Sequence, residues 1–160
     1  MNKRPEQEPP RERQPAQVVA ERCAAVMWEG DEASRSLGMT LEAVRPGYAR
    51  ISMPIRADMV NGHDNCHGGL IFTLADSAFA FACNGSNRLT VASGASIDFI
   101  APGRRGDVLT ATCQEQSRSG RTGVYDVRVE NQDGRLVALF RGRSYTIAGS
   151  LVPGLEVEEP

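Results

Sequence analysis

Alternating hydrophobic and polar positions divide the first part of the chain into one amphipathic helix and two strands. From residue 17 to 28 the apolar side chains recur at helical spacing, which predicts a helix with one buried face. Two extended runs follow at residues 39–45 and 48–55, and Pro46-Gly47 between them is a favoured turn pair. Every other residue of the second run is apolar, as expected of a strand with one side on a core.

A second helix is predicted over residues 70–83, and its surface is apolar on every side. A helix of this kind is enclosed by the rest of the fold rather than exposed along one face. Gly68 and Gly69 come directly before it, and the polar residues 84–87 end it. We therefore expect this helix to lie at the centre of the molecule.

Four further strands are predicted at residues 91–100, 108–116, 123–130 and 136–147, separated by short turns. The order is two strands, one enclosed helix, then four strands. It favours an α+β fold in which an antiparallel sheet of about six strands packs on one long helix. Such a sheet leaves edge strands and a second face to be covered. We expect a second subunit to cover them.

Length and composition fit a single folded domain. Of the 160 residues, 41% are hydrophobic and 24% are charged, as in average globular proteins. We expect the domain to span residues 17–148, with a disordered tail at residues 1–16 and a flexible tail at residues 149–160. No apolar run is long enough to span a bilayer, and no signal-peptide pattern opens the chain. We therefore expect a cytoplasmic protein with no membrane partner.

Net charge and cysteine spacing exclude two further classes of function. A formal charge of −2 provides no general electrostatic attraction to nucleic acid, so no nucleic-acid partner is expected. The four cysteines are widely separated and form no C-x-x-C pair, so reduced thiols are expected rather than a zinc ribbon or a redox dithiol.

Asp76 is the decisive candidate for chemistry. It lies in the middle of the enclosed helix, among Leu74, Ala75, Ala78 and Phe79, so its carboxylate is expected to emerge into apolar surroundings. Burying an unpaired charge is costly or forces a pKa shift, so a chain that keeps one has a partner or a use for it. Two interpretations stay open: a structural aspartate bound by an arginine or by backbone donors, and a functional carboxylate.

Gly68 and Gly69 form a second candidate feature. Their N–H groups, unhindered by side chains, lie at the positive end of the helix dipole, where a developing oxyanion is stabilised. The alternative is a glycine hinge that lets the loop turn in. Asp76 lies about 12 Å from Gly68 along a helix axis, too far for contact within one chain. If two subunits place these helices antiparallel, the aspartate of one approaches the glycines of the other, and a composite site forms at the dimer interface.

The loop before the glycines contains Asn61, His63, Cys66 and His67, whose side chains allow three interpretations. A zinc site is disfavoured because only three potential ligands crowd one short loop, so we expect no metal. A Cys66 nucleophile with His67 as its base is disfavoured because adjacent residues are rarely aimed at each other. We expect Asn61 and His67 to fix the loop or to orient substrate.

Arginines at turns and strand ends complete the candidate set. Most are expected to be solvated surface charges, and a few could clamp phosphates. The residues that we predict to contact substrate are His67, Gly69, Ser77, Arg104 and Arg121.

The chain resembles the hotdog-fold acyl-CoA thioesterases of the phenylacetic acid degradation pathway, from about residue 37 to 147. The resemblance is carried by NGHDNCHGGLIFTLADSAFAFACN, IDFIAPGRRGDVLTA and TGVYDVRVENQDGRLVALFRGRS. It implies a sheet wrapped around the long helix, a dimer with a continuous sheet, and commonly a homotetramer built as a dimer of dimers. It also implies the catalytic roles. Asp76 is the carboxylate, Gly68 provides the N–H that polarises the carbonyl, and Asn61 is the polar partner near the attacking water.

The function that this resemblance implies is hydrolysis of phenylacetyl-CoA and ring-hydroxylated phenylacetyl-CoA to the free acid and CoA, in phenylacetate catabolism and with no cofactor. The chemistry agrees, because preorganised N–H donors favour the charge that develops on the thioester oxygen. The leaving thiolate, with a conjugate acid of pKa about 8.5 like cysteine, needs no strong general acid. We expect Asp76 to activate water as a general base, with direct nucleophilic attack as the open alternative.

Two other functions remain as alternatives. In a hotdog dehydratase of hydroxyacyl thioesters, a loop histidine would act with the helix carboxylate. His63 precedes Asp76 at a suitable spacing, but Asp64, Asn65 and Cys66 replace the Phe-Pro-Gly that should follow it. The other alternative is a non-catalytic acyl-CoA binding module that keeps the fold without turnover. Thiol release from phenylacetyl-CoA distinguishes all three functions.

Overall fold

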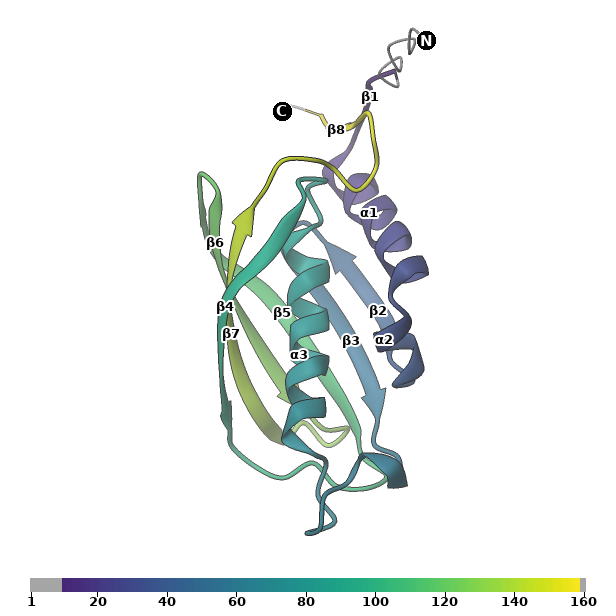
Figure 1. The fold of residues 1–160 in the computed structure, drawn as a ribbon, viewed down its shortest axis with the longest axis vertical. Helices are drawn as coiled ribbons and strands as arrows, with labels where there is room; N and C mark the ends of the chain where they lie inside the picture. Colours follow the sequence, from purple (N-terminus) through teal and green to yellow (C-terminus); the bar gives the residue numbers. More distant parts are fainter. Residues whose placement is uncertain (1–9, 159–160) are drawn as a thin grey trace, which may run out of the picture.

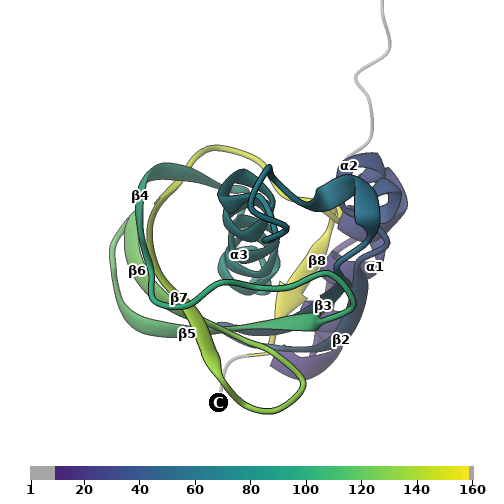
Figure 2. The same cartoon turned by 90° about the horizontal axis from the view of Figure 1, so that it is seen from below.

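An antiparallel sheet curves around one central helix in the computed structural model, which describes residues 10–158 (Figures 1 and 2). The helix is α3 (Gly68–Cys83). The six strands, in their order across the sheet, are β2 (Thr40–Arg45), β3 (Tyr48–Pro54), β5 (Val108–Ser119), β6 (Thr122–Glu130), β7 (Leu136–Thr146) and β4 (Thr90–Phe99). The predicted α+β hotdog fold is therefore confirmed.

Aromatic rings join α3 to the inner face of the sheet. Phe79 of α3 lies 5.4 Å from Tyr125 of β6 and 6.0 Å from Phe140 of β7, measured between ring centroids. Gly142 of β7 allows this close approach, since a Cβ atom there would lie 2.8 Å from the Phe79 ring. Helix and sheet therefore share one tightly packed core, which fixes the direction in which each face of α3 points.

Two helices flank the sheet beside β2. The predicted first helix is α1 (Ala16–Gly30), and it lies along β2 (Figure 1). The Gln17 side chain donates a hydrogen bond of 2.9 Å to the carbonyl of Val44 in β2. The second helix, α2 (Glu32–Ser36), was not predicted from the sequence. The single-turn helix η1 (Ala57–Met59) lies in the loop before α3.

The two ends of the chain form a separate parallel pair, β1 (Glu12–Gln14) and β8 (Leu155–Val157), beyond the start of α1 (Figure 1). The prediction of tails at residues 1–16 and 149–160 is wrong for these segments, because their backbones pair and Leu155 packs with Val19 and Cys23. Residues 1–9 and 159–160 lie outside the described part of the chain.

Asn87, in the turn between α3 and β4, anchors the C-terminal segment. Its backbone is left-handed, with φ of +58°. Its side-chain amide donates to the carbonyls of Val152 and Leu155 at 2.7 and 2.8 Å. Its side-chain oxygen accepts from the N–H groups of Leu151 and Val152 at 3.0 and 2.9 Å. One buried side chain therefore satisfies four backbone groups of a segment that follows it by more than sixty residues.

Strand β4 ends the sheet on the side opposite β2 and pairs only with β7 within the described residues. Apolar side chains on and beside this edge are exposed, at Val91, Phe99 and Ile100. An open edge with apolar neighbours fits the predicted pairing of subunits. Between residues 10 and 158, no helix is both long and apolar enough to cross a membrane.

Candidate active site

The glycine turn at the start of α3 is held by its flanking loop. The N–H groups of Cys66 and His67 donate to the carbonyls of Gly103 and Met59, at 2.7 and 2.8 Å. The His67 ring then caps the helix, because its Nδ1 atom accepts a 3.0 Å hydrogen bond from the N–H of Gly69. His67 thus fixes the loop, which is one of the two roles predicted for it.

Only one of the two predicted glycine donors is open. The Gly69 N–H is engaged by His67, whereas the Gly68 N–H makes no hydrogen bond within residues 10–158. It lies at the positive end of the α3 dipole and borders a pocket of about 290 Å³. The backbone at Gly68 can therefore offer a single donor to a carbonyl oxygen bound in this pocket.

The pocket beside Gly68 is apolar. Its walls include Ile71, Phe99 and Ile100. The Phe99 ring lies directly over the glycine, and a Cβ atom at position 68 would come within 3.0 Å of Phe99 Cζ. A side chain at position 68 would therefore push against the Phe99 ring, which lines the same pocket.

Asp76 lies half-buried on α3, on the same helix face as Gly69 and Thr73. Burial raises the pKa of its carboxyl above the ordinary value, as the predicted apolar surroundings require. Within residues 10–158 the carboxylate has no hydrogen bond and no ion pair. The interpretation of Asp76 as a structural ion-pair partner therefore has no support in this part of the chain.

A single chain does not bring the three predicted catalytic residues together. Asp76 and Gly68 are two helical turns apart on α3, about 12 Å along its axis. Asn61 is exposed, and its side-chain oxygen accepts from the N–H groups of His63 and Asn65 at 3.0 and 3.3 Å. Asn61 therefore closes its own loop, and its role near an attacking water stays a prediction.

Ser77, predicted to contact substrate, connects two helices. Its hydroxyl lies 2.8 Å from that of Ser34 in α2, and Ser34 donates at 2.6 Å to Asp31, which caps α2. The Ser77 hydroxyl is thus already engaged within the chain.

The two predicted arginines lie at opposite ends of the sheet. Arg104 follows β4 and forms an isolated bridge with Asn65 of the loop before the glycines. Arg121 lies in the β5–β6 hairpin, where its carbonyl accepts from the N–H of Thr146 at the end of β7. The β5–β6 hairpin and the connection that follows β4 are at opposite ends of the ribbon in Figure 1. Contact of Arg104 and Arg121 with substrate therefore stays a prediction.

The loop cysteine is unsuited to nucleophilic attack. Burial raises the pKa of the Cys66 thiol to about 11, so little thiolate exists at neutral pH. His63 lies exposed in a turn. Across residues 10–158, no three His, Cys, Asp or Glu side chains gather closely enough to hold a metal ion.

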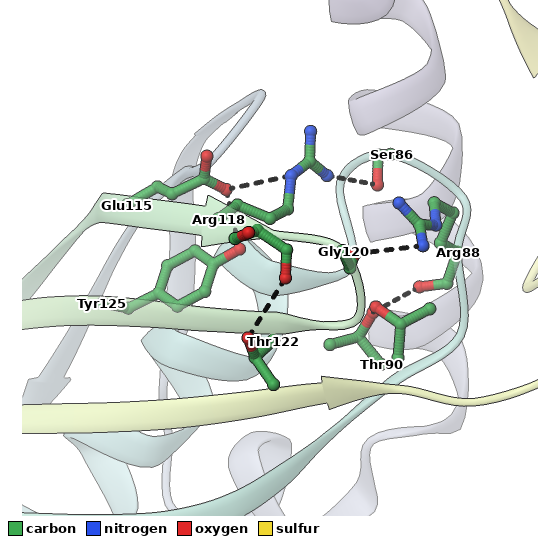
Figure 3. A network of polar contacts seen from close by, with 10 residues as sticks. Ser86, Arg88, Thr90, Glu115, Arg118, Gly120, Thr122 and Tyr125 are labelled. Atoms are coloured by element: carbon green, nitrogen blue, oxygen red, sulfur yellow. Dashed lines mark hydrogen bonds and ion pairs between the residues drawn. The ribbon is translucent and has the colours of Figure 1, made fainter.

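A polar cluster at the other end of α3 was missed by the sequence reasoning. It joins Tyr125, Glu115, Arg118 and Ser86 (Figure 3). A β-bulge between Glu115 and Ser117 shifts the register of β5 and breaks the alternation on which the strand prediction relies. The clustering of polar residues at 114–119 is the only signal of it in the sequence.

The sequence and the fold of this chain are both similar to those of known thioesterases. Residues 63–138 match the model of the thioesterase superfamily. The acyl-coenzyme A thioesterase PaaI of Escherichia coli is 46% identical over 128 residues, which cover 80% of this chain and 91% of that protein. The solved structure of E. coli PaaI, from the phenylacetic acid degradation operon, superposes with a TM-score of 0.83 over 84% of this chain and 98% of that one, at 44% identity. A hypothetical thioesterase from Streptococcus pneumoniae, solved with coenzyme A, has a TM-score of 0.67 at 26% identity and covers 70% of this chain and 90% of its own.

Proposed function

The chain belongs to the thioesterase superfamily and is a thioester hydrolase, and from this premise we propose that its substrates are phenylacetyl-CoA and ring-hydroxylated phenylacetyl-CoA. The products are the free acid and CoA, and the reaction belongs to phenylacetate catabolism. The relative at 46% identity is named an acyl-coenzyme A thioesterase, and its solved structure is described as part of the phenylacetic acid degradation operon. Because coenzyme A thioesters are intracellular metabolites, we also propose a cytoplasmic location.

The observation that carries the proposal is the unpaired carboxylate of Asp76 on the helix that begins with an open Gly68 N–H. A base is most effective when its pKa lies near the working pH, and burial moves that of Asp76 upward. The Gly68 donor at the helix terminus stabilises the negative charge that develops on the thioester oxygen. Asp76 takes a proton from water as the water attacks the carbonyl carbon, and the C–S bond then breaks to release the CoA thiolate.

Two subunits complete the site in this proposal. A second copy adds its β4 antiparallel to the open β4 edge, which extends the sheet and sets the two α3 helices side by side in opposite directions. Asp76 of one subunit then approaches the Gly68 end of its partner, which removes the separation of about 12 Å within one chain. Light scattering tests this dimer, and it tests the predicted dimer of dimers.

The pocket beside Gly68 supports a compact acyl group. At about 290 Å³ it lies at the lower end of ligand-pocket volumes, and Ile71, Phe99 and Ile100 give it apolar walls. An aryl ring packs favourably against such walls, whereas a long fatty chain exceeds the pocket. We expect kcat/KM to fall from phenylacetyl-CoA to long-chain acyl-CoA in a substrate panel.

The decisive experiment replaces Asp76 by Asn and measures thiol release from phenylacetyl-CoA. Loss of the base is expected to lower kcat by about 10²- to 10⁴-fold, with CoA binding retained. Asp133→Asn, the same change in the exposed β6–β7 turn, is the matched control and keeps full activity. Normal turnover by Asp76→Asn refutes the assignment.

Single turnover in ¹⁸O-labelled water separates the two roles of the carboxylate. A general base leaves Asp76 unlabelled, because the water oxygen goes directly to the product acid. Incorporation of ¹⁸O into Asp76 identifies a mixed anhydride and overturns the general-base mechanism.

A further inference from the structure

Asn61 is followed by a glycine in an open turn of the loop before α3. Both residues are exposed, and a Cβ atom at Gly62 would meet nothing within 4 Å. The Gly62 N–H makes no hydrogen bond to any group of residues 10–158. A backbone nitrogen with no side chain beside it and no acceptor on its N–H is accessible as a nucleophile toward the neighbouring side chain.

The side-chain amide of Asn61 is polarised by its own loop. Its Oδ1 atom accepts from the N–H groups of His63 and Asn65 at 3.0 and 3.3 Å. Two donors on a carbonyl oxygen stabilise the negative charge that develops there when a nucleophile adds to the carbonyl carbon. The Nδ2 group donates no hydrogen bond within the part of the chain that the structure describes. No contact there therefore opposes its loss as ammonia.

We propose that Asn61 is a site of spontaneous deamidation, with the Gly62 nitrogen as the nucleophile. Base removes the proton of the Gly62 N–H, the nitrogen forms a bond to Cγ of Asn61, and the Cγ–Nδ2 bond breaks. Ammonia leaves, and a succinimide ring joins the two residues. Water then opens the ring at either carbonyl, which gives aspartate or isoaspartate. The net change is hydrolysis of one amide by one water molecule, so no oxidant or reductant takes part.

The other Asn-Gly pair of the chain, Asn84-Gly85, has the opposite environment. Asn84 is only 5% exposed, and its Nδ2 group donates to the carbonyls of Ala80 and Thr90 at 3.0 and 2.9 Å. Loss of ammonia there takes the donor away from two carbonyls, which is costly in a buried place. We therefore expect Asn84 to stay intact while Asn61 reacts.

Asn131, in the β6–β7 turn, repeats the hydrogen bonds of Asn61 without the glycine. Its Oδ1 atom accepts from the N–H groups of Asp133 and Arg135 at 3.1 and 3.0 Å. In both turns the asparagine N–H also donates to the carbonyl four residues further on. The residue after Asn131 is Gln132, whose Cβ atom hinders its own nitrogen. Asn131 therefore separates the effect of the glycine from that of the two donors.

The two products differ in their effect on the loop. Aspartate keeps a side-chain oxygen that accepts from His63 and Asn65, whereas isoaspartate lengthens the main chain by one methylene group. The loop is closed by the N–H of His67, which donates to the carbonyl of Met59 at 2.8 Å. Gly68 follows directly, so a longer chain between these contacts displaces its N–H. That isoaspartate lowers turnover is a consequence that rests on the proposed function.

The experiment incubates the full chain in mildly alkaline buffer made with ¹⁸O-labelled water and follows each asparagine by peptide mass mapping. The label marks residues that react during the incubation. Gly62→Ala removes the unhindered nitrogen at a position with room for a methyl group and no positive φ. Gln132→Gly is the matched gain of a glycine, after Asn131. Methylation by an isoaspartyl methyltransferase counts isoaspartate, and the same chain in urea gives the rates without structure.

We expect label at position 61 of the folded parental protein and none at positions 84 and 131, whereas Asn61 and Asn84 react alike in urea. Gly62→Ala slows the reaction about tenfold or more with its initial kcat unchanged, and Gln132→Gly creates a second site at Asn131. Equal rates at Asn61 and Asn84 in the folded protein, or an unchanged rate in Gly62→Ala, overturn the proposal. An intact Asn131 in Gln132→Gly refutes activation by the two donors.

Mass mapping needs no substrate, so the modification is measured even in a protein that hydrolyses no phenylacetyl-CoA. If the proposed function holds, kcat of the parental protein falls in step with its isoaspartate content, and Gly62→Ala incubated for the same time keeps its activity. Isoaspartate that accumulates at position 61 with full kcat retained refutes the displacement of the Gly68 donor.

Discussion

Replacing Asn87 by Ala tests whether one side chain holds the terminal segment in place. The substitution removes the partner of two carbonyl and two N–H groups, belonging to Leu151, Val152 and Leu155. It also puts a Cβ-bearing residue without a polar side chain into a backbone with φ of +58°. Asn tolerates this left-handed conformation, whereas Ala does not.

The magnitude follows from these two losses. Four hydrogen bonds at about 1 kcal/mol each set an upper bound of about 4 kcal/mol for the contacts. The left-handed backbone adds about 1 to 2 kcal/mol for Ala. Because the segment can detach and regain hydrogen bonds to water, the loss is limited by the free energy of docking Leu155 against Val19 and Cys23. We expect the free energy of unfolding to fall by about 3 kcal/mol for Asn87→Ala, and by about 1 kcal/mol less for Asn87→Gly.

Urea unfolding followed by the fluorescence of Trp28, the single tryptophan, measures both variants. Limited proteolysis reports separately on release of residues 150–157. If both variants unfold within about 0.5 kcal/mol of the parental protein and resist cleavage equally, Asn87 is no anchor. If Gly is as destabilising as Ala, the backbone conformation contributes nothing and the hydrogen bonds account for the whole loss.

Three further predictions concern α3. Burial raises the pKa of Asp76, so the folded protein binds this proton more tightly than the unfolded chain and loses stability as pH rises above about 3.9. Asp76→Asn is therefore more stable than the parent at neutral pH. In urea unfolding at about pH 4, the difference in unfolding free energy between the two proteins is smaller. A difference that grows on acidification contradicts this prediction. Gly142→Ala places a methyl group 2.8 Å from the Phe79 ring and lowers stability by about 1 to 3 kcal/mol in a thermal melt, whereas an unchanged melting temperature contradicts the close packing. Ser77→Ala cuts the contact with Ser34 and lowers stability by about 1 kcal/mol with kcat retained; a large loss of kcat would instead place Ser77 at the substrate.

The fold was predictable because its signals are local and periodic. The alternation at residues 48–55 appears as β3, and the run that is apolar on all sides appears as the enclosed helix α3. Short α2 has too few residues to show a period, and it depends on Asp31, which caps it by accepting from the N–H of Ser34. Strands β1 and β8 are only three residues each, and they pair across almost the whole chain. A contact of that sequence separation leaves no periodic trace in either segment.

The candidate site was predictable in its residue types and less so in their partners. An acid on an apolar helix and a glycine pair at a helix start are visible in the sequence, which identifies Asp76 and Gly68. The hydrogen bond from the Gly69 N–H to His67 Nδ1 depends on the orientation of the ring, which residue spacing does not predict. The Glu115 cluster depends on a β-bulge between Glu115 and Ser117, which pairs Arg118 with Gly123 and so puts Arg118 on the face of Glu115, against the alternation of the strand.

The unequal edges of the sheet have a consequence for self-association. Helix α1 lies along β2, and Gln17 occupies the Val44 carbonyl, so this margin offers few free groups to another strand. At the other edge of the six-stranded sheet, β4 pairs with β7 alone within residues 10–158. In the proposed dimer both copies use this edge, so the growth of that sheet stops at two subunits and does not continue into fibres.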